Sequence, residues 1–363
     1  MAKRDIIVVG ASAGGIAALT DFVKQLPEDF GGAIFIVLHI SSHSPSNLPA
    51  ILSRAGTLKA RHPSDGEIMK PGTIYIAPPD HHILLDRKCI LVKKGPRENR
   101  FRPSIDALFR SAAYVFQHRV VGIVLSGLLN DGTSGLWSIK RMGGIGIIQD
   151  PADAQFSSMP TNAMEYVQAD YILPVSEMGS VLGKLMSRNI KRNAKSRKRE
   201  VELMKMEVII ARQDNSFEMG IMKMGTLTPF TCPECHGVLV RLIEGQIVRF
   251  RCHTGHAFTA SALLAELTTS VEEKMWEAMR GLEETTMLLK HIGIHFKQQG
   301  HHDMSAMFIQ KSKVTATKAQ IIHDSVFEQE LLSEDLRFQK SSNDVKKKRI
   351  KTKKTKGSGR HDA

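Results

Sequence analysis

The chain has 363 residues, more than a single hydrophobic core usually holds, so its length predicts more than one domain. Hydrophobic residues make up 42% of the sequence, yet no apolar run approaches the ~20 residues that cross a bilayer, which excludes an integral membrane protein. The net charge of +13 comes largely from two basic clusters, residues 187–199 and 346–356, and few aromatic side chains accompany them, so nucleic-acid binding is not expected.

The first residues and the cysteines indicate the compartment. Residues 1–10 open with basic side chains, but their apolar run is short and leads into a glycine-rich turn, so they predict a strand rather than a signal peptide. The four cysteines are too few and too unevenly spaced for a disulfide framework. Both features favour a cytoplasmic protein.

Up to about residue 187, short apolar runs alternate with helical patterns, which is typical of an open α/β sheet with parallel strands. The predicted strands are residues 6–9, 33–38, 120–125 and 145–148. Between the second and third of these, residues 72–77 and 83–92 are typical of hairpins, and residues 104–116 of a helix. We therefore predict that residues 1–187 form one domain with a doubly wound parallel sheet.

Four further segments follow this domain. We predict a basic linker or helix at residues 188–216, a zinc-ribbon-like module at 217–258, a helical hairpin at 259–338 and a disordered basic tail at 339–363. The connection inside the hairpin is expected around residues 291–300. Its apolar residues recur at helical spacing, so we expect the hairpin to dock on a partner or to form a homo-oligomer.

Residues 10–15 form a glycine-rich turn between the first strand and a helix expected at residues 16–26. Such a turn either cradles a phosphate with its backbone N–H groups or projects Ser12 above the sheet as a nucleophile. On its own it would also fit a helix cap by Ser12. The second strand, however, ends in His39 rather than in the acidic residue that binds a dinucleotide ribose. A histidine there can act as general base for Ser12, which favours the nucleophile.

The third strand, residues 120–125, runs into a polar turn that contains Asp131. Asp131 is expected to orient His39 and stabilise its protonated form, or else to cap the helix beginning near Thr133. Ser12, His39 and Asp131 each follow a predicted parallel strand, and the carboxyl ends of such strands form the ligand crevice of open α/β sheets. This coincidence favours a catalytic triad.

Five motifs recur in order along this half of the chain: residues 10–15, His39, and residues 72–78, 102–106 and 127–132. Together, over residues 5–187, the chain resembles the chemotaxis protein-glutamate methylesterases, the CheB family. The resemblance implies a serine carboxylesterase with Ser12, His39 and Asp131 as its triad and no cofactor for catalysis. The implied reaction is hydrolysis of glutamyl γ-methyl esters on a methylated chemoreceptor or other signalling protein to glutamate and methanol, with glutamine deamidation as a second reaction.

In this mechanism Ser12 forms an acyl-enzyme, and the backbone N–H groups of Ala13 and Leu128 are expected to hold the oxyanion. Arg102 is expected to hold an acidic receptor surface or to brace the site. As an equal alternative, it is an ordinary residue at a helix start.

The sequence departs from the family pattern at two points. Leu128 and Leu129 stand where the family has methionine and glycine before Asp131, and Leu129 adds a Cβ to the turn. This difference supports an alternative function, a catalytically weakened scaffold that binds signalling partners through its C-terminal segments. The chain also starts directly at the first strand, where the family usually has a receiver domain. Control by a receiver in the same chain is therefore not expected.

The predicted ribbon contains four residues with metal-ligand spacing, namely Cys232, Cys235, Cys252 and His256. A C-x-x-C pair and a C-x-x-x-H pair, separated by a predicted hairpin at residues 238–250, are typical of a closed tetrahedral site, so we predict a structural Zn²⁺. His253 is the rival fourth ligand. We expect metal loss to unfold this module without disabling a remote esterase domain.

Overall fold

The computed structural model describes residues 3–40, 45–190, 198–212 and 220–328. The chain divides into two compact units, Met1–Leu267 and Thr268–Ala363, which are treated separately below. Most of the first basic cluster, all of the second and the predicted tail at residues 339–363 lie outside the described residues.

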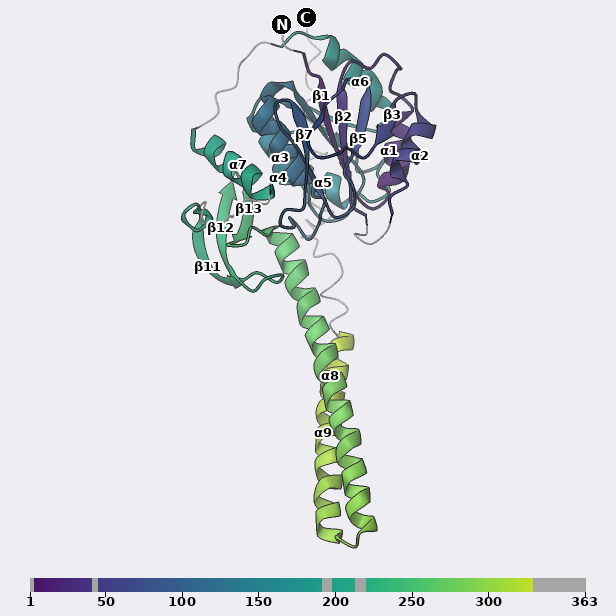
Figure 1. Ribbon diagram of the computed structural model, residues 1–363, viewed down its shortest axis with the longest axis vertical. Coiled ribbons are helices and arrows are strands. Elements are labelled where there is room, and N and C mark those ends of the chain that lie inside the picture. Colours follow the sequence, from purple (N-terminus) through teal and green to yellow (C-terminus); the bar gives the residue numbers. More distant parts are fainter. Residues whose placement is uncertain (1–2, 41–44, 191–197, 213–219, 329–363) are drawn as a thin grey trace, which may run out of the picture. The chain divides into compact units, whose positions relative to one another are not determined.

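A seven-stranded sheet forms the centre of the first unit (Figure 1). Its order is β10-β9-β8-β1-β2-β5-β3, and every neighbouring pair is parallel. The strands are β1 (Ile6–Ala11), β2 (Ala33–Leu38), β3 (Lys59–Arg61), β5 (Thr73–Ile76), β8 (Val120–Val124), β9 (Ile145–Gln149) and β10 (Tyr171–Leu173). Parallel strands lie on both sides of the central β1, so the predicted parallel α/β sheet is confirmed.

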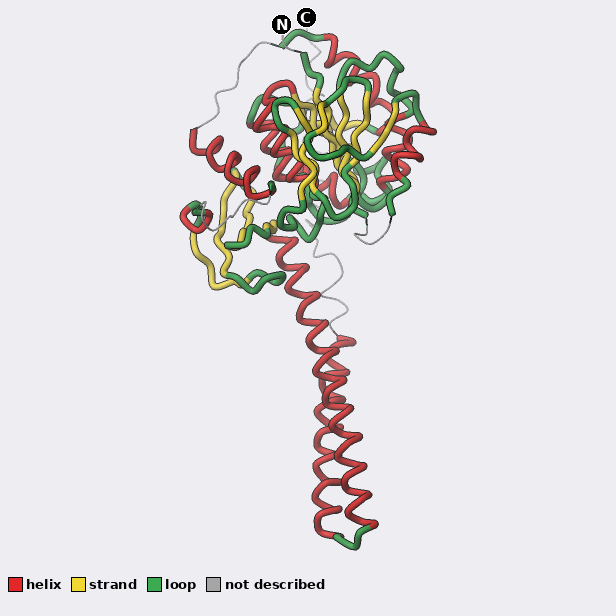
Figure 2. The backbone as a smooth tube through the Cα atoms, in the orientation of Figure 1, coloured by secondary structure: helices red, strands yellow, loops and turns green. Residues whose placement is uncertain are grey.

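Helices cover both faces of this sheet (Figure 2). One face packs against α3 (Ile105–Phe116), α4 (Thr133–Arg141) and α5 (Ser158–Tyr166), and the other against α1 (Gly15–Val23), α2 (Leu48–Ala55) and α6 (Val175–Ser187). Strands covered on both faces require continuous apolar runs, and all residues of β1, β2 and β8 are buried. The carboxyl ends of these three strands therefore meet at one edge.

The prediction of a hairpin at residues 72–77 is wrong. That segment is β5, a parallel strand of the main sheet between β2 and β3. The prediction failed because β5 has only four residues, and so short a run does not show whether a strand is buried on one face or on both. The hairpin at residues 83–92 is confirmed as β6 (His82–Leu85) and β7 (Cys89–Lys93), which pair antiparallel beside β4 (Glu67–Ile68).

The remainder of the first unit consists of α7 (Lys198–Ala211), the short helix η2 (Ile221–Lys223) and an antiparallel sheet in the order β11-β12-β13-β14. Its strands are β11 (Thr226–Thr231), β12 (Val238–Glu244), β13 (Ile247–Cys252) and β14 (Ala257–Thr259). We call residues 226–259 the cysteine module. Its core is small and includes Cys232, Leu239, Cys252 and Phe258.

The second unit is a helical hairpin. Helix α8 (Ala260–Gln298) starts in the first unit and runs beside α9 (His302–Glu328) (Figure 1). Within the hairpin, the Ser312 hydroxyl donates to the Thr286 carbonyl at 3.0 Å. The expected connection at residues 291–300 is placed too early, because α8 continues to Gln298 and Gly293 packs against α9. None of the described helices is long and apolar enough to cross a membrane.

Candidate active site

Ser12 directly follows β1. Its turn is hydrogen-bonded to the loop that follows the neighbouring strand β8. Its backbone N–H donates to the Ser126 carbonyl at 2.9 Å. Gly14 then takes a φ of 71° and begins α1 without any side-chain cap, so Ser12 is not a helix cap. The left-handed φ explains a glycine at this point. The turn leaves the Ser12 hydroxyl at the carboxyl edge of the sheet.

His39 follows β2, the strand next to β1, and contacts both other members of the predicted triad. Its Nδ1 lies 3.1 Å from Ser12 Oγ, and its Nε2 lies 2.9 Å from Asp131 Oδ2. An ionised carboxylate only accepts hydrogen bonds, so the neutral ring carries its proton on Nε2 and leaves Nδ1 free to accept from the Ser12 hydroxyl. The His39 side chain is 4% exposed.

Asp131 is fully buried at the amino end of α3. Its carboxylate accepts hydrogen bonds from the Ser104 hydroxyl at 3.0 Å and from the Ile105 N–H at 2.7 Å. The alternative that Asp131 caps the helix near Thr133 is therefore wrong. The Asp131 carboxylate accepts hydrogen bonds at the start of α3, and the residue at the N-cap of α4 is Gly132. Burial alone would raise the pKa of Asp131, but His39, the Asn99 amide and the Ile105 N–H outweigh it and lower the pKa below its usual range.

Asp106 is a second buried carboxyl beside Asp131. Its Oδ1 accepts from the N–H groups of Gly132 at 3.0 Å and Gly135 at 2.6 Å, at the start of α4. Burial, followed by the neighbouring charge of Asp131, raises the pKa of Asp106 to about 8. Near neutral pH the pair therefore consists of an ionised Asp131 and a protonated Asp106, which avoids two adjacent buried charges.

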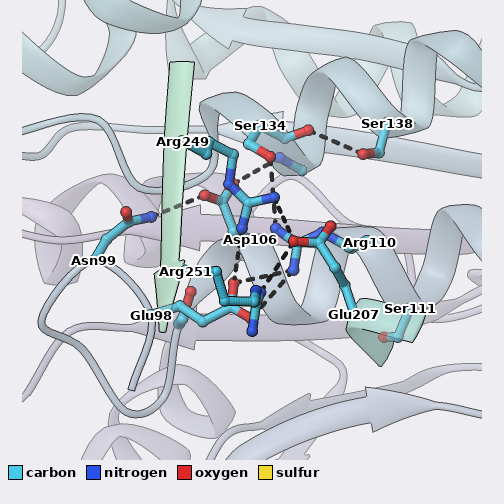
Figure 3. A network of polar contacts seen from close by, with 12 residues as sticks. Glu98, Asn99, Asp106, Arg110, Ser111, Ser134, Ser138, Glu207, Arg249 and Arg251 are labelled. Atoms are coloured by element: carbon cyan, nitrogen blue, oxygen red, sulfur yellow. Dashed lines mark hydrogen bonds and ion pairs between the residues drawn. The ribbon is translucent and has the colours of Figure 1, made fainter. Parts of the chain in front are cut away.

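Two residues that the sequence did not single out complete the surroundings of the triad. The Asn99 amide donates to Asp131 Oδ1 and to Asp106 Oδ2, both at 2.9 Å, and points toward Asp106 in Figure 3. The Phe101 ring stacks on the His39 ring with centroids 3.5 Å apart. Asn99 and Phe101 belong to a stretch without helical or strand periodicity. The one sequence signal that could have identified them is their position just before the motif at residues 102–106.

The predicted oxyanion donors lie in the two turns around Ser12. Among the described residues, neither the Ala13 nor the Leu128 backbone N–H donates a hydrogen bond to another residue. The two turns approach closely, since a Cβ on Gly127 would lie 2.9 Å from the Ser12 Cβ. Leu129 has a φ of 61°, so the turn keeps a left-handed residue although its side chain is not glycine.

Arg102 lies away from the triad contacts. Its guanidinium donates to Asp80 at 2.7 Å and to the Gly95 carbonyl at 2.9 Å, and its side chain is 16% exposed. Despite partial burial, which acts the other way, Lys94 and Arg102 together lower the pKa of Asp80 to about 2. These contacts suit a brace between the β5–β6 loop and the segment before α3.

The four predicted metal ligands converge in the cysteine module: Cys232, Cys235, Cys252 and His256. Their ligand atoms all lie within 4.8 Å of one another. The Cys235 and Cys252 sulfur atoms are 3.6 Å apart, and His256 Nδ1 lies 3.6 Å from Cys252 Sγ and 3.7 Å from Cys232 Sγ. A tetrahedral site with Zn–S bonds of ~2.3 Å separates its sulfur atoms by ~3.8 Å, so the spacing fits zinc.

The second nitrogen of the His256 ring also has a partner typical of metal sites. His256 Nε2 lies 3.3 Å from a carboxylate oxygen of Glu234, and such outer carboxylates commonly orient a ligating histidine. The rival His253 is not among the converging residues. The module is also not remote from the esterase residues, contrary to expectation, because the Thr259 N–H of β14 donates to Asn99 Oδ1 at 2.8 Å.

Comparisons with known proteins cover the same half of the chain. The family described as CheB methylesterase matches residues 7–182. A protein of Leptospira interrogans, provisionally named a protein-glutamate methylesterase/protein-glutamine glutaminase, is 36% identical over 187 residues, which are 51% of this chain and 97% of that protein. The protein-glutamate methylesterase/protein-glutamine glutaminase 2 of Methanosarcina mazei is 32% identical over 50% of this chain and 52% of its own length.

The crystal structure of the Thermotoga maritima CheB methylesterase catalytic domain covers 50% of this chain and 99% of its own, with 30% identity and a TM-score of 0.49. Family assignment rests on the sequence matches, above all on the Leptospira protein, which is covered almost end to end. This chain belongs to the CheB methylesterase family of hydrolases.

Proposed function

We propose that the chain is a serine carboxylesterase that hydrolyses glutamyl γ-methyl esters on chemoreceptor-type proteins to glutamate and methanol. The observation that carries this proposal is the continuous series of contacts from Ser12 Oγ through His39 to Asp131. The names of the relatives supply the ester and indicate glutamine deamidation as a second reaction. A receptor substrate of this kind would place the protein in the cytoplasm.

In the proposed reaction His39 Nδ1 removes the proton from Ser12 Oγ as that oxygen attacks the ester carbonyl. The negative charge on the carbonyl oxygen is held by the N–H groups of Ala13 and Leu128, each typically contributing ~2.7 to 4 kcal/mol. His39 then returns the proton to the departing methoxide, which leaves as methanol. Water, deprotonated by His39, cleaves the acyl-enzyme and releases glutamate. Asp131 remains ionised and stabilises the protonated ring.

The alternative function is a catalytically weakened scaffold, and its support is the Leu128-Leu129 departure. The left-handed φ of Leu129 argues against it, because the turn keeps the shape that a glycine would give. In the described part of the chain the N–H groups of Ala13 and Leu128 have no acceptor, which favours an oxyanion site as well. A scaffold would need none of these features.

Methanol release from methylated receptor fragments tests the proposal. We expect the parent protein to release methanol, and Ser12→Ala to lose nearly all of this activity, because no acyl-enzyme can form. Ser53→Ala is the matched control, since the Ser53 hydroxyl on α2 exchanges hydrogen bonds with the Ala60 backbone, away from Ser12. Mass spectrometry of the same fragments would detect deamidated glutamine. Equal methanol release by the parent and Ser12→Ala would refute the triad.

We also propose that the four converging residues of the cysteine module hold a structural Zn²⁺, which would join the two ends of the module. We expect about one zinc per chain in purified protein. Cys232→Ser should lose it, whereas Cys89→Ser should retain it, because Cys89 lies on β7. Metal analysis that finds no zinc in the parent protein would contradict this site.

The helical hairpin remains our proposed contact for a signalling partner or a second copy of the chain. Large apolar side chains on it are exposed, including Val271, Trp276, Met287 and Leu288. Exposed apolar side chains of this size would suit an interaction surface if a partner covers them together. Sedimentation of the full chain tests the homo-oligomer, since a monomer at every concentration would exclude it.

A further inference from the structure

A buried cluster of charged side chains joins the cysteine module to the esterase part (Figure 3). Arg110 of α3 binds Glu98 at 3.0 Å. Arg251 of β13 donates to the same Glu98 at 2.8 Å and to Glu207 of α7 at 3.1 Å. Arg249, also on β13, donates to Glu207 at 2.7 Å. All five side chains are 1% exposed.

The charges of this cluster depend on one another. The guanidinium groups of Arg110, Arg251 and Arg249 outweigh the effect of burial and hold the pKa of Glu98 well below its usual range. A buried charge that loses its partner is strongly unfavourable, so small shifts of β13 against α3 are penalised. The cluster therefore fixes where the module lies along the segment that contains Glu98.

Strand β14 then extends this contact along the backbone. Ala257 forms a parallel bridge with Glu98, the Asn99 N–H donates to the Ala257 carbonyl at 2.7 Å, and the Ala257 N–H donates to the Arg97 carbonyl at 3.2 Å. Asn99 and Arg100 have positive φ values of 52° and 77°. Such a backbone needs external support, and β14 supplies it.

The Asn99 side chain transmits this support to the triad. Its Oδ1 accepts from the Thr259 N–H at 2.8 Å, which fixes the oxygen toward β14. Its Nδ2 therefore faces the opposite way and donates to Asp131 and Asp106. Without the Thr259 N–H at this position, the amide could rotate and present its oxygen to an ionised carboxylate, which would repel it.

A second contact runs beside the first. The Thr259 hydroxyl donates to Asn130 Oδ1 at 2.8 Å, and Asn130 Nδ2 donates to the Ser261 hydroxyl at 2.6 Å. Asn130 directly precedes Asp131. Residues on both sides of the Asp131 carboxylate are thus held by β14 and the first turn of α8.

We infer that the cysteine module is a structural part of the esterase site, and that Asn99 is the positioning residue through which Thr259 holds Asp131 in place. The inference rests on the proposed triad. When the module is seated, Asp131 is fixed to receive the His39 Nε2–H and His39 Nδ1 faces Ser12. When β14 is displaced, the loop of residues 98–101 is released, and with it Asn99 and the Phe101 ring that covers His39.

The test uses two substitutions and a matched control in the full chain. Asn99→Gly removes the amide and suits the positive φ of this position. Thr259→Val removes only the hydroxyl that binds Asn130 and the first turn of α8. Thr228→Val is the control, because the contacts that the described residues make with the Thr228 hydroxyl, at Leu239 and Phe230, lie within the module.

Hydrolysis of p-nitrophenyl acetate and the rate of Ser12 modification by a fluorophosphonate measure the site itself. We expect kcat to fall roughly 10- to 100-fold for Asn99→Gly, because misplacing a reacting group by about an ångström has an effect of this size. KM should change less than about twofold. Thr259→Val should lie between Asn99→Gly and the parent, and Thr228→Val should match the parent. Thermal midpoints identify any variant that has unfolded.

A second readout does not depend on activity. The His39 Nε2–H bonded to Asp131 should give a low-field proton resonance, which we expect to shift or broaden in Asn99→Gly and Thr259→Val. A folded Asn99→Gly variant that retains both this resonance and the parental fluorophosphonate rate would overturn the positioning role of Asn99. A folded Thr259→Val variant that retains both would overturn the contribution of the Asn130 contact, because this variant keeps the Thr259 N–H that binds Asn99. If the parent itself fails to react at Ser12, the proposed function fails, and the resonance alone then decides whether Asn99 and Thr259 hold Asp131.

Discussion

The parallel sheet and the contact between α3 and the cysteine module are equally buried, but they are built from opposite chemistry. Every residue of β1 and β2 is apolar or glycine and lies within the core. The contact instead buries arginine and glutamate side chains, among them Arg110 and Glu207. Apolar burial is a non-directional attraction, whereas the charged contact depends on the distance between each arginine and its glutamate partners.

This difference separates two tasks. The sheet brings Ser12, His39 and the turn before Asp131 to one edge. The charged contact then fixes the loop that supports the Asp131 carboxylate. We therefore expect substitutions in the two regions to differ in both size and pH dependence.

The largest effect is expected where the two regions meet, at Asp131. Asp131→Asn should lower kcat about 10⁴-fold, because an amide no longer holds the His39 ring with its proton on Nε2. Hydrolysis of a small activated ester by the variant and the parent measures this effect. A loss of less than tenfold would show that His39 does not depend on Asp131.

Within the charged contact, Arg110→Met should destabilise the first unit by about 3 to 5 kcal/mol, because Glu98 and Glu207 lose a buried partner. Arg119→Met is the matched control. Arg119 pairs with Asp5, and both side chains are about one third exposed. An ion pair in such a position contributes at most about 1 kcal/mol. Urea unfolding of both variants gives the comparison, and equal losses would show that burial of the cluster has no energetic consequence.

The charged contact should also weaken in acid. Although burial would raise it, the pKa of Glu207 is lowered to about 2 by Arg110, Arg249 and Arg251. Its stabilisation is therefore complete above the usual glutamate pKa of about 4.5, and as pH falls toward about 2 roughly 3 kcal/mol is lost. In Glu207→Gln the unfolding free energy should change less over this interval. A parallel pH dependence in both proteins would contradict the assignment.

The smallest effect is expected at the edge of the sheet, in the turn before Asp131. Leu129→Gly should stabilise the protein by at most about 1 kcal/mol, because it relieves a left-handed residue while adding freedom to the unfolded chain. Ester hydrolysis should not fall. A marked loss of activity would instead mean that the Leu129 side chain itself contributes to the site.

The sequence predicted those parts that depend on local pattern. The strands that carry Ser12 and His39 are continuous apolar runs, so their sheet and its edge could be inferred. The convergence of the four candidate metal ligands could be inferred because C-x-x-C and C-x-x-x-H spacings bring donors together over short distances. The helix ends were less certain: α8 passes through Gly293 because packing against α9 outweighs the weak helix preference of glycine.

The contact around the triad carboxylate could not be predicted. Glu98, Arg110, Glu207 and Arg251 are charged residues spread over four segments, and individually each is typical of a solvent-exposed surface. Asn99 lies in an irregular loop and binds Thr259, 160 positions later. Only the folded chain brings these residues together, since no period or spacing links them.

The order of synthesis gives the contact between Asn99 and Thr259 a further consequence. A ribosome adds roughly 5 to 20 residues per second, so the 160 positions between them correspond to roughly 8 to 30 seconds. Once Asp131 has been added, 32 positions after Asn99, the nascent chain contains Ser12, His39 and Asp131, but not yet the strand that closes the loop beside them. If the inference above holds, we expect a newly made chain to gain its full hydrolytic capacity only after β14 has emerged, and a chain terminated before β14 to stay less active.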